Sequence, residues 1–318
     1  MPQDSLYILN GQVLNAQGDT LFRLDDSTLK AAETEMERVD ARFDADESPS
    51  WSPLWIFAPF LFVIVVHFLV VYIKKAIIGG RKRRLLESKA IEFEAILQAH
   101  SPYYRKLDDV QKKIFLRRTL SFIADKTFHY VELKEEDRIP VLVSAVAIQI
   151  TFGLENYLLD YFKDIYIMRT NYHFGLSHIP FEGHVNSNGI YLSWNNFVNA
   201  FSDYSDGSNL GLHEMAHALA YVNFTANEGE DDHFKNRFKT FSKTGRKIFN
   251  AMQTGKTNLL GSYAATNYHE FWAVSVENFF ERPQALQMEL PDLYRELVIL
   301  LNQDPLSGSS MQKLIERA

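Results

Sequence analysis

The longest apolar stretch in the chain lies in its N-terminal third. No charged side chain occurs between Glu47 and Lys74, and residues 54–73 are almost all Phe, Leu, Ile, Val or Ala, with His67 the one strongly polar exception. Twenty residues of helix span about 30 Å, the thickness of the hydrocarbon core of a bilayer. A buried core helix is the alternative, but helices of soluble proteins rarely run so long without a polar face. The pattern therefore predicts a single transmembrane helix over residues 51–75.

The charges on the two sides of this stretch differ in sign. Residues 1–50 carry four basic and eleven acidic side chains, which accounts for the whole formal net charge of −7. A basic segment follows the stretch and contains Lys74, Lys75, Arg81, Lys82, Arg83 and Arg84. The positive-inside rule then places residues 1–50 outside the membrane and the rest of the chain in the cytoplasm. We expect an acidic, flexible extracytoplasmic segment, a single-pass helix that contacts the bilayer of the inner (cell) membrane through residues 54–73, and a basic juxtamembrane linker over 76–90.

Beyond the linker, apolar residues recur at helical spacing. From Leu85 to about Tyr130 they step by three and four positions, which predicts helix. Another helix begins near Asp137 and ends at Gly153. Its interior is apolar on nearly all sides and too short to cross a bilayer, so we expect it to be the central buried helix of a domain.

Two short strands interrupt the helical pattern. Alternating isoleucines predict one strand over 164–169, and a turn at 186–189 leads into a second strand over 190–194. The second strand is either an ordinary sheet strand or an edge strand that pairs with an extended peptide. The fold class is therefore α+β, a mainly helical domain over 91–305 with a small sheet, followed by a C-terminal tail over 306–318.

The composition narrows the chemistry available to this domain. Cysteine is absent, which excludes disulfide scaffolds and thiolate metal sites, so any metal must be held by histidine and carboxylate. After residue 50 the basic and acidic side chains balance at 29 each. Because no basic surface is indicated, we expect no nucleic acid among the partners.

One short motif carries metal chemistry. His213 and His217 are separated by four positions, and Glu214 directly follows the first histidine. On a helix, residues four apart lie on one face, about 6 Å apart along the axis, so both imidazoles can reach one metal ion. Glu214 is rotated by roughly 100° from His213, off the metal but within reach of a water bound to it. The spacing therefore predicts a zinc site with Glu214 as general base.

The surroundings of the motif favour this interpretation over a surface helix with two solvated histidines. The motif lies in a helical run from Leu210 to Val222, with Ser208 and Asn209 as candidate caps. An apolar stripe beside the histidines indicates that the helix is at least half buried.

The third ligand is less certain from spacing. Position 223 is Asn and position 220 is Ala, so the glycine and third histidine of the metzincin pattern are absent. A glutamate from a later helix is the usual alternative, and the predicted helix 267–280 offers Glu270 and Glu277 on one face, with His269 as a rival. Glu270 also fits the third position of a capping box opened by Asn267, which would explain it without a metal.

A family resemblance bears on this choice. The motif, followed by Ser262-Tyr263-Ala264-Ala265-Thr266 and by Glu270-Phe271-Trp272-Ala273-Val274 with Glu277-x-Phe279-Phe280-Glu281-Arg282-Pro283, resembles the Mlc titration factor A family of zinc peptidases. The likeness covers roughly residues 90–305. It implies a zincin-like fold, zinc held by His213, His217 and Glu270, Glu214 as the base and Tyr263 in the active site. The family is soluble, and the N-terminal apolar stretch and acidic leader depart from it.

The resemblance implies a gluzincin-like zinc peptidase that hydrolyses peptide bonds through a zinc-bound water activated by Glu214, and the predicted transmembrane helix would anchor it to the membrane. In this mechanism the Tyr263 hydroxyl shares the developing oxyanion with the metal, and Glu277 orients a ligand histidine. Aminopeptidase and endopeptidase action both stay open. A different class of function also stays open, because the family's namesake binds a transcriptional repressor: a regulator that captures a protein partner at the membrane, with weak or secondary peptidase activity.

Overall fold

The computed structural model describes parts of residues 7–38, residues 61–69, Arg84, and residues 88–307 except 176–177, 201–205 and 227. The chain divides into two compact units, residues 1–73 and residues 74–318, and each is described by itself.

The first unit contains a small antiparallel sheet that was not predicted from the sequence. Strands β1 (Tyr7–Leu9), β2 (Gln12–Leu14) and β3 (Thr20–Arg23) pair in that order. Leu9 pairs with Gln12, so only the dipeptide Asn-Gly separates β1 from β2, and this dipeptide is the strongest short-range signal for a hairpin.

The predicted transmembrane stretch falls largely outside the described residues. Of residues 54–73, only 61–69 are described, as helix with exposed side chains. Among the helices that are described, none combines the length and the apolar character needed to cross a membrane. Most of the predicted tail, residues 308–318, also lies outside the described residues.

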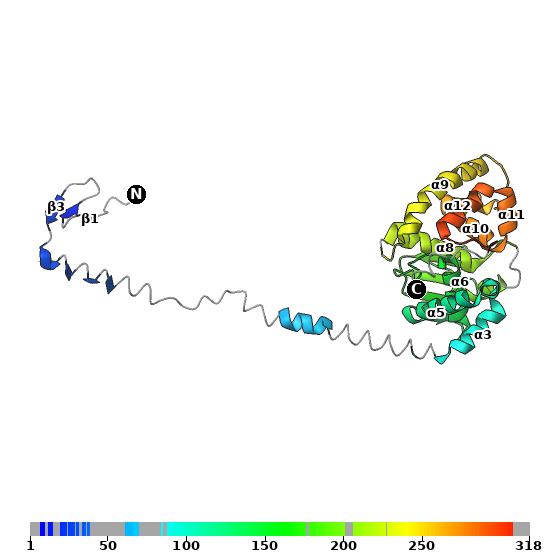
Figure 1. The fold of residues 1–318 in the computed structure, drawn as a ribbon, viewed down its shortest axis with the longest axis horizontal. Helices are drawn as coiled ribbons and strands as arrows, with labels where there is room; N and C mark the ends of the chain where they lie inside the picture. The colour runs from blue at the N-terminus through cyan, green and yellow to red at the C-terminus, as the bar shows by residue number, and fades with distance from the viewer. Residues whose placement is uncertain are drawn as a thin grey trace. The chain divides into compact units, whose positions relative to one another are not determined.

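The second unit is mainly helical with a four-stranded mixed sheet, which confirms the predicted fold class (Figure 1). The sheet order is β4-β5-β7-β6, with β4 (Thr127–Val131), β5 (Asp164–Met168) and β7 (Gly189–Ser193) parallel and β6 (Gly183–Asn186) antiparallel to β7. The helices and helical turns are α3 (Ala90–His100), α4 (Pro102–Lys106), α5 (Asp109–Asp125), α6 (Arg138–Thr151), α7 (Trp194–Asn199), α8 (Leu210–Tyr221), a π-helical turn (Val222–Ala226), α9 (Asp232–Gln253), a 3-10 turn (Tyr263–Ala265), α10 (Tyr268–Glu281), α11 (Pro283–Glu289) and α12 (Pro291–Leu301).

The sheet corrects one helix prediction and decides between the two alternatives for the second predicted strand. The helical pattern predicted up to Tyr130 ends at Asp125, because residues 127–131 form β4 and pair in parallel with β5. The strand predicted over 190–194 is β7, which is paired on both sides and therefore offers no free edge to a peptide. The edge next to it belongs to β6, the other arm of the hairpin.

Aromatic rings stack across the whole four-stranded sheet on one face. His129, Tyr166, Tyr191 and His184 come from β4, β5, β7 and β6 at paired positions. Successive ring centroids lie 4.6, 4.5 and 4.3 Å apart with nearly parallel planes. The opposite face carries Ile165, Ile167, Ile190 and Leu192, which are fully buried in the core. We call the four stacked rings the aromatic ladder; it fixes the register of all four strands.

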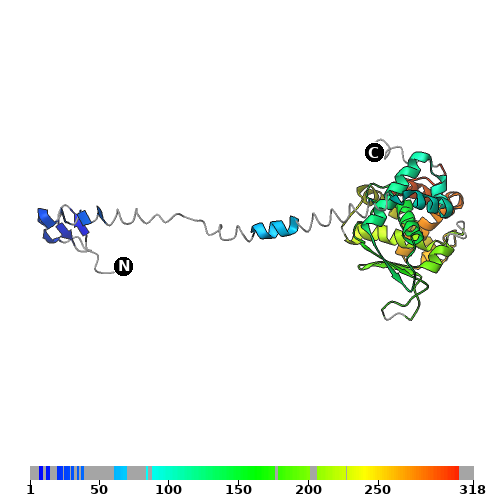
Figure 2. The same cartoon turned by 90° about the horizontal axis from the view of Figure 1, so that it is seen from below.

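Helix α8 holds the centre of the second unit. It packs against β6 and β7 on the sheet, against α6, and against α10. Figure 1 shows α9 to α12 grouped beyond α8, with α5 and α6 on the other side, and Figure 2 shows the strands gathered at one margin of the unit. Helix α6 is the central buried helix that the sequence predicted, with every residue from Val141 to Thr151 buried.

Asp231 lies in an acidic loop, residues 228–232, but is buried, with only 2% of its surface exposed. Its carboxylate caps α9 by accepting from the Phe234 N–H, and it also accepts from the N–H groups of Glu155 and Asn156. A buried acid that receives three backbone N–H groups is fully compensated, which is why the loop folds inward there.

Arg118 binds the carbonyl groups at the C-terminal end of α6, and this contact can be tested by mutation. The buried guanidinium of Arg118 donates to the carbonyl oxygens of Thr151, Phe152 and Leu154 at 3.4, 3.1 and 3.0 Å. Replacing Arg118 with Met keeps the apolar stem and removes these charge-assisted bonds, so we expect the free energy of unfolding to fall by about 2–3 kcal/mol.

The measurement is urea unfolding of the full chain, with Arg117→Met as the matched control. Arg117 is the exposed neighbour on α5, and its replacement should change stability by less than about 0.5 kcal/mol. Equal losses in the two variants would contradict this role for Arg118.

Candidate metal centre

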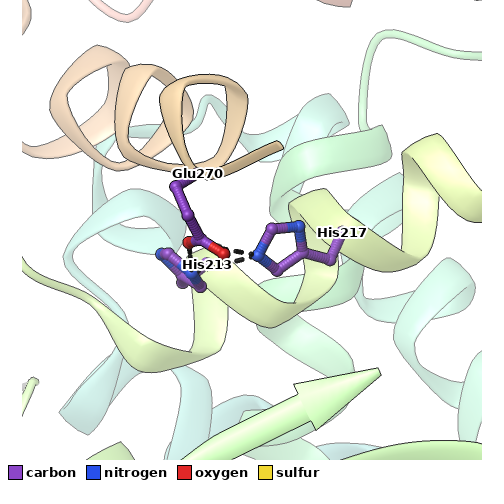
Figure 3. Close-up of side chains that lie close together, drawn as sticks. All are labelled: His213, His217 and Glu270. Carbon is purple, nitrogen blue, oxygen red and sulfur yellow. Dashed lines mark hydrogen bonds and ion pairs between the residues drawn. The ribbon is translucent and has the colours of Figure 1, made fainter. Parts of the chain in front are cut away.

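Three side chains from two helices converge on one point. His213 and His217 leave α8, and Glu270 leaves α10 toward both of them (Figure 3). The two histidine Nε2 atoms are 3.1 Å apart, and the Oε2 atom of Glu270 lies 3.0 Å from Nε2 of His213 and 3.6 Å from Nε2 of His217. One ligand atom from each residue lies within 4.8 Å of the others, close enough for all three to bind a single ion.

The helix caps explain how these side chains are placed. Asn209 begins α8, as predicted, and its side-chain oxygen accepts from the N–H of Leu212 at 3.0 Å. Asn267 begins α10, and its oxygen accepts from the N–H groups of His269 and Glu270. Asn267 thus caps the backbone N–H of Glu270, but the Glu270 side chain points at the histidines and does not complete the predicted capping box.

Glu277 lies on the other side of His213. Its Oε1 atom accepts from Nδ1 of His213 at 2.7 Å, and its Oε2 atom accepts from the backbone N–H of Asn209 at 2.6 Å. Because Glu277 holds the proton at Nδ1, Nε2 is the ring nitrogen left to bind a metal at the common point. One turn later, Glu281 accepts from the Asn209 amide at 2.8 Å and from the N–H of Gly207 at 3.1 Å. The carboxylates of α10 therefore fix both His213 and the start of its helix.

Glu214 is buried between α8 and the edge strand β6. Burial, and to a lesser extent the charges of Glu270 and Glu277, raises the pKa of its carboxyl to about 8 against the opposing effect of His213. Its Oε2 atom is buried and has no hydrogen-bond partner among the described residues. Gly183 lies directly against it: a Cβ atom at this position would come within 2.6 Å of Oε1. Sequence reasoning missed Gly183, because nothing along the chain pairs it with position 214.

Tyr263 opens the 3-10 turn before α10 and lies beside the histidines, with its ring centroid 6.0 Å from that of His213. Partial burial and the neighbouring charge of Glu270 raise the pKa of its hydroxyl to about 12. The hydroxyl therefore stays protonated near neutral pH and can donate a hydrogen bond. His269, the rival candidate for the third ligand, is exposed at the rim of the cleft, and Nε2 of His233 in α9 pairs with the carbonyl oxygen of Ile299.

The convergence point lies in a cleft with two arms. One arm, of about 620 Å³, follows α8 past His217 toward the π-helical turn and α9. The other, of about 760 Å³, lies toward the N-terminal end of α8, and residues such as Gly183, Glu214 and Tyr263 line both. The free edge of β6 forms one wall beside the general-base candidate.

The residues present fit a divalent metal. Two imidazole nitrogens and one carboxylate oxygen are the donor set of many catalytic zinc sites. The buried Oε2 atom of Glu270 contacts the Nε2 atoms of both histidines and has no other partner among the described residues. Although burial opposes it, the carboxylates of Glu270 and Glu277 raise the pKa of His213 to about 10, which shows that the local field favours a cation at this point.

Comparison with known proteins bears on the same residues. A family model described as glucose-regulated metallo-peptidase M90 matches residues 79–300, which includes every residue of the site. An uncharacterised protein of Synechocystis, slr2042, is 28% identical over 112 residues. That match covers 34% of this chain and 41% of the relative, so the chain spans less than half the length of that curated relative.

The contact between Gly183 and Glu214 can be tested by a double-mutant cycle. Gly183→Ala forces the buried Glu214 side chain or strand β6 to move, and we expect it to lower the free energy of unfolding by about 1–3 kcal/mol. In a Glu214→Ala background the obstructing atoms are gone, so the same change should cost at least about 1 kcal/mol less. Thermal or urea unfolding of the four proteins measures the difference. An identical loss in both backgrounds would place the clash elsewhere.

Proposed function

Because the chain belongs to the glucose-regulated metallo-peptidase M90 family, we propose that it is a zinc-dependent peptidase in which His213, His217 and Glu270 hold the metal. The match also confirms the resemblance to the Mlc titration factor A family. The observation that carries the proposal is the convergence of three ligand atoms from α8 and α10 beside the buried carboxyl of Glu214.

The proposed reaction is hydrolysis of a peptide bond. The zinc ion, when bound, acts as a Lewis acid toward the scissile carbonyl and lowers the pKa of water. Glu214 takes a proton from the attacking water as the new C–O bond forms, and delivers it to the departing amine as the C–N bond breaks. The Tyr263 hydroxyl donates a hydrogen bond to the carbonyl oxygen as negative charge develops there, a contribution of about 2–4 kcal/mol. Glu277 is a positioning residue that holds the ring of His213.

The substrate backbone pairs with β6 in this proposal. This strand ends the sheet, its free edge borders the cleft, and Gly183 brings it against Glu214. An extended peptide that adds to such an edge gains main-chain hydrogen bonds, which places its carbonyl groups in register with the catalytic side chains.

Membrane anchoring is part of the same proposal. Its support is the uncharged stretch 54–73 with the basic segment after it and the acidic segment before it. We propose that the peptidase unit lies on the cytoplasmic side of the inner membrane, with residues 1–50 on the opposite side.

The general base has a direct test. Glu214→Gln keeps the volume of the side chain and leaves all three ligands in place, so the variant should retain zinc while kcat/KM for chromogenic amino-acid amides and peptides falls by about 10²–10⁴-fold. Tyr263→Phe should lower it by about 10²-fold.

Zinc content and the unfolding midpoint are measured in parallel for both variants. Full activity of Glu214→Gln would end the proposed mechanism. Zinc-free protein that still captures a protein partner while hydrolysing nothing would identify the regulator that the family resemblance also permits.

The ligand set is tested by comparing two glutamates of one helix. Glu270→Ala removes a proposed ligand, and we expect the purified protein to lose its zinc. Glu277→Ala removes a partner of His213, so zinc should still bind, with an affinity reduced by about 10–100-fold. Metal analysis after dialysis against graded chelator separates these outcomes. Equal zinc content in Glu270→Ala and the parent protein would rule out the assignment.

A further inference from the structure

The arm of the cleft beyond His217 has an apolar wall. Residues on the same face of α8 and the turn after it continue past the histidine, and aromatic residues of α9 and α10 pack beside them. The members of this wall are Ala220, Phe224, Phe238 and Trp272. The ring centroids of Phe224 and Phe238 are 4.6 Å apart, and those of Phe238 and Trp272 are 5.6 Å apart. Phe224 remains 45% exposed, so the wall offers apolar surface to a ligand.

The wall is held in place. The indole N–H of Trp272 donates to the carbonyl oxygen of Ala216 at 2.8 Å, which ties the ring of α10 to the motif helix. Phe224 lies in the π-helical turn whose Asn223 side chain bonds both the Leu219 carbonyl oxygen and the Asp231 N–H. Because these elements are hydrogen-bonded on their inner sides, the exposed ring of Phe224 and the half-buried ring of Phe238 present a preformed surface.

A single basic side chain accompanies this wall. Among the described residues that line the arm, Arg246 of α9 is the one lysine or arginine, and its side chain is exposed. Its guanidinium carbon lies 4.4 Å from the ring centroid of Tyr268. Gly245 allows the ring to come this close, since a Cβ atom there would lie 2.8 Å from the Tyr268 hydroxyl oxygen. Within the described residues, no carboxylate lies within 4 Å of the Arg246 nitrogens.

A guanidinium stacked on a ring keeps its edge N–H groups available to a carboxylate, and its planar fork matches that group in a bidentate manner. The opposite arm has the reverse charge. It is lined by Glu182 and Asp206 on exposed positions, and the described lining residues there include no lysine or arginine. The cleft is therefore polarised, with its positive end beyond His217.

We propose that the arm beyond His217 is a subsite for a peptide carboxylate that lies close to a bulky apolar side chain, with the apolar group against Phe224 and Phe238 and the carboxylate on Arg246. This rests on the proposed peptidase function. The carboxylate comes either from the C-terminus of the substrate or from a Glu or Asp side chain, and both present the same two oxygens to the arginine.

The experiment uses the full, zinc-loaded chain and four fluorogenic hexapeptides that share one phenylalanine. The first pair differs only at the C-terminus, which is a free acid in one peptide and an amide in the other. The second pair are both amides and differ only in the residue after the phenylalanine, which is Glu in one and Gln in the other. We expect the parent protein to cleave at least one carboxylate peptide about five- to tenfold more efficiently than its neutral counterpart, with the preference shrinking as salt is raised.

Arg246→Gln should abolish that preference, because kcat/KM for the carboxylate peptides should fall to the value of their neutral counterparts. Lys247→Gln is the matched control, because Lys247 is the exposed neighbour on α9 and does not line the cleft. It removes the same charge from the same helix and should keep the preference. A preference confined to the free acid identifies the C-terminal carboxylate as the ligand, and one confined to the Glu peptide identifies an acidic side chain.

Binding of the labelled peptides to the Glu214→Gln protein, followed by fluorescence anisotropy, provides a readout independent of turnover. The subsite would be ruled out if carboxylate and neutral peptides were cleaved and bound equally well, or if the preference persisted in Arg246→Gln. Neither result would contradict the peptidase function. Failure of the parent protein to cleave any peptide would count against the proposed function, and the anisotropy ratios would still decide the subsite.

Discussion

The packing of α10 against α8 is the constraint on which the candidate site depends. The Trp272 indole bonds the Ala216 carbonyl oxygen, while Glu270 and Glu277 reach the two ring nitrogens of His213 from positions two turns apart. A shift of α10 by one turn along α8, about 5.4 Å, would break all three contacts together. The ligand geometry is thus a property of a helix pair, which is stiffer than any loop that could carry the same residues.

The same packing gathers negative charge in the interior. Glu214, Glu277 and Glu281 are buried, and burial, together with the charges of Asp206 and Glu277, raises the pKa of Glu281 to about 8. Burying carboxylates without a cation is unfavourable, and the local N–H donors offset it only in part. A divalent cation that binds the folded state alone would relieve this repulsion, so metal binding and the stability of the second unit are linked.

The sequence predicts features that depend on neighbours along the chain. The motif helix with its Asn209 cap, the buried helix α6 and strand β5 follow from local spacing. The choice of Glu270 as third ligand rested on a family resemblance. Features that depend on distant partners were missed. Residues 127–131 form a strand because they pair with β5, more than thirty positions later. Asp231 is buried because the backbone N–H groups of Glu155 and Asn156 donate to its carboxylate. Likewise, the order of the sheet decided that β6, and not β7, has the free edge.

The aromatic ladder has a consequence for molecular recognition. A slip of β6 by one residue along β7 would lift His184 from Tyr191 and turn Gly183 away from α8, so this margin of the sheet is rigid before any ligand arrives. A peptide that docks there meets a receptor already in its final shape, and the conformational entropy lost on association comes mainly from the peptide. Ligands that are extended in free solution, such as sequences rich in β-branched residues, therefore have the advantage over flexible ones.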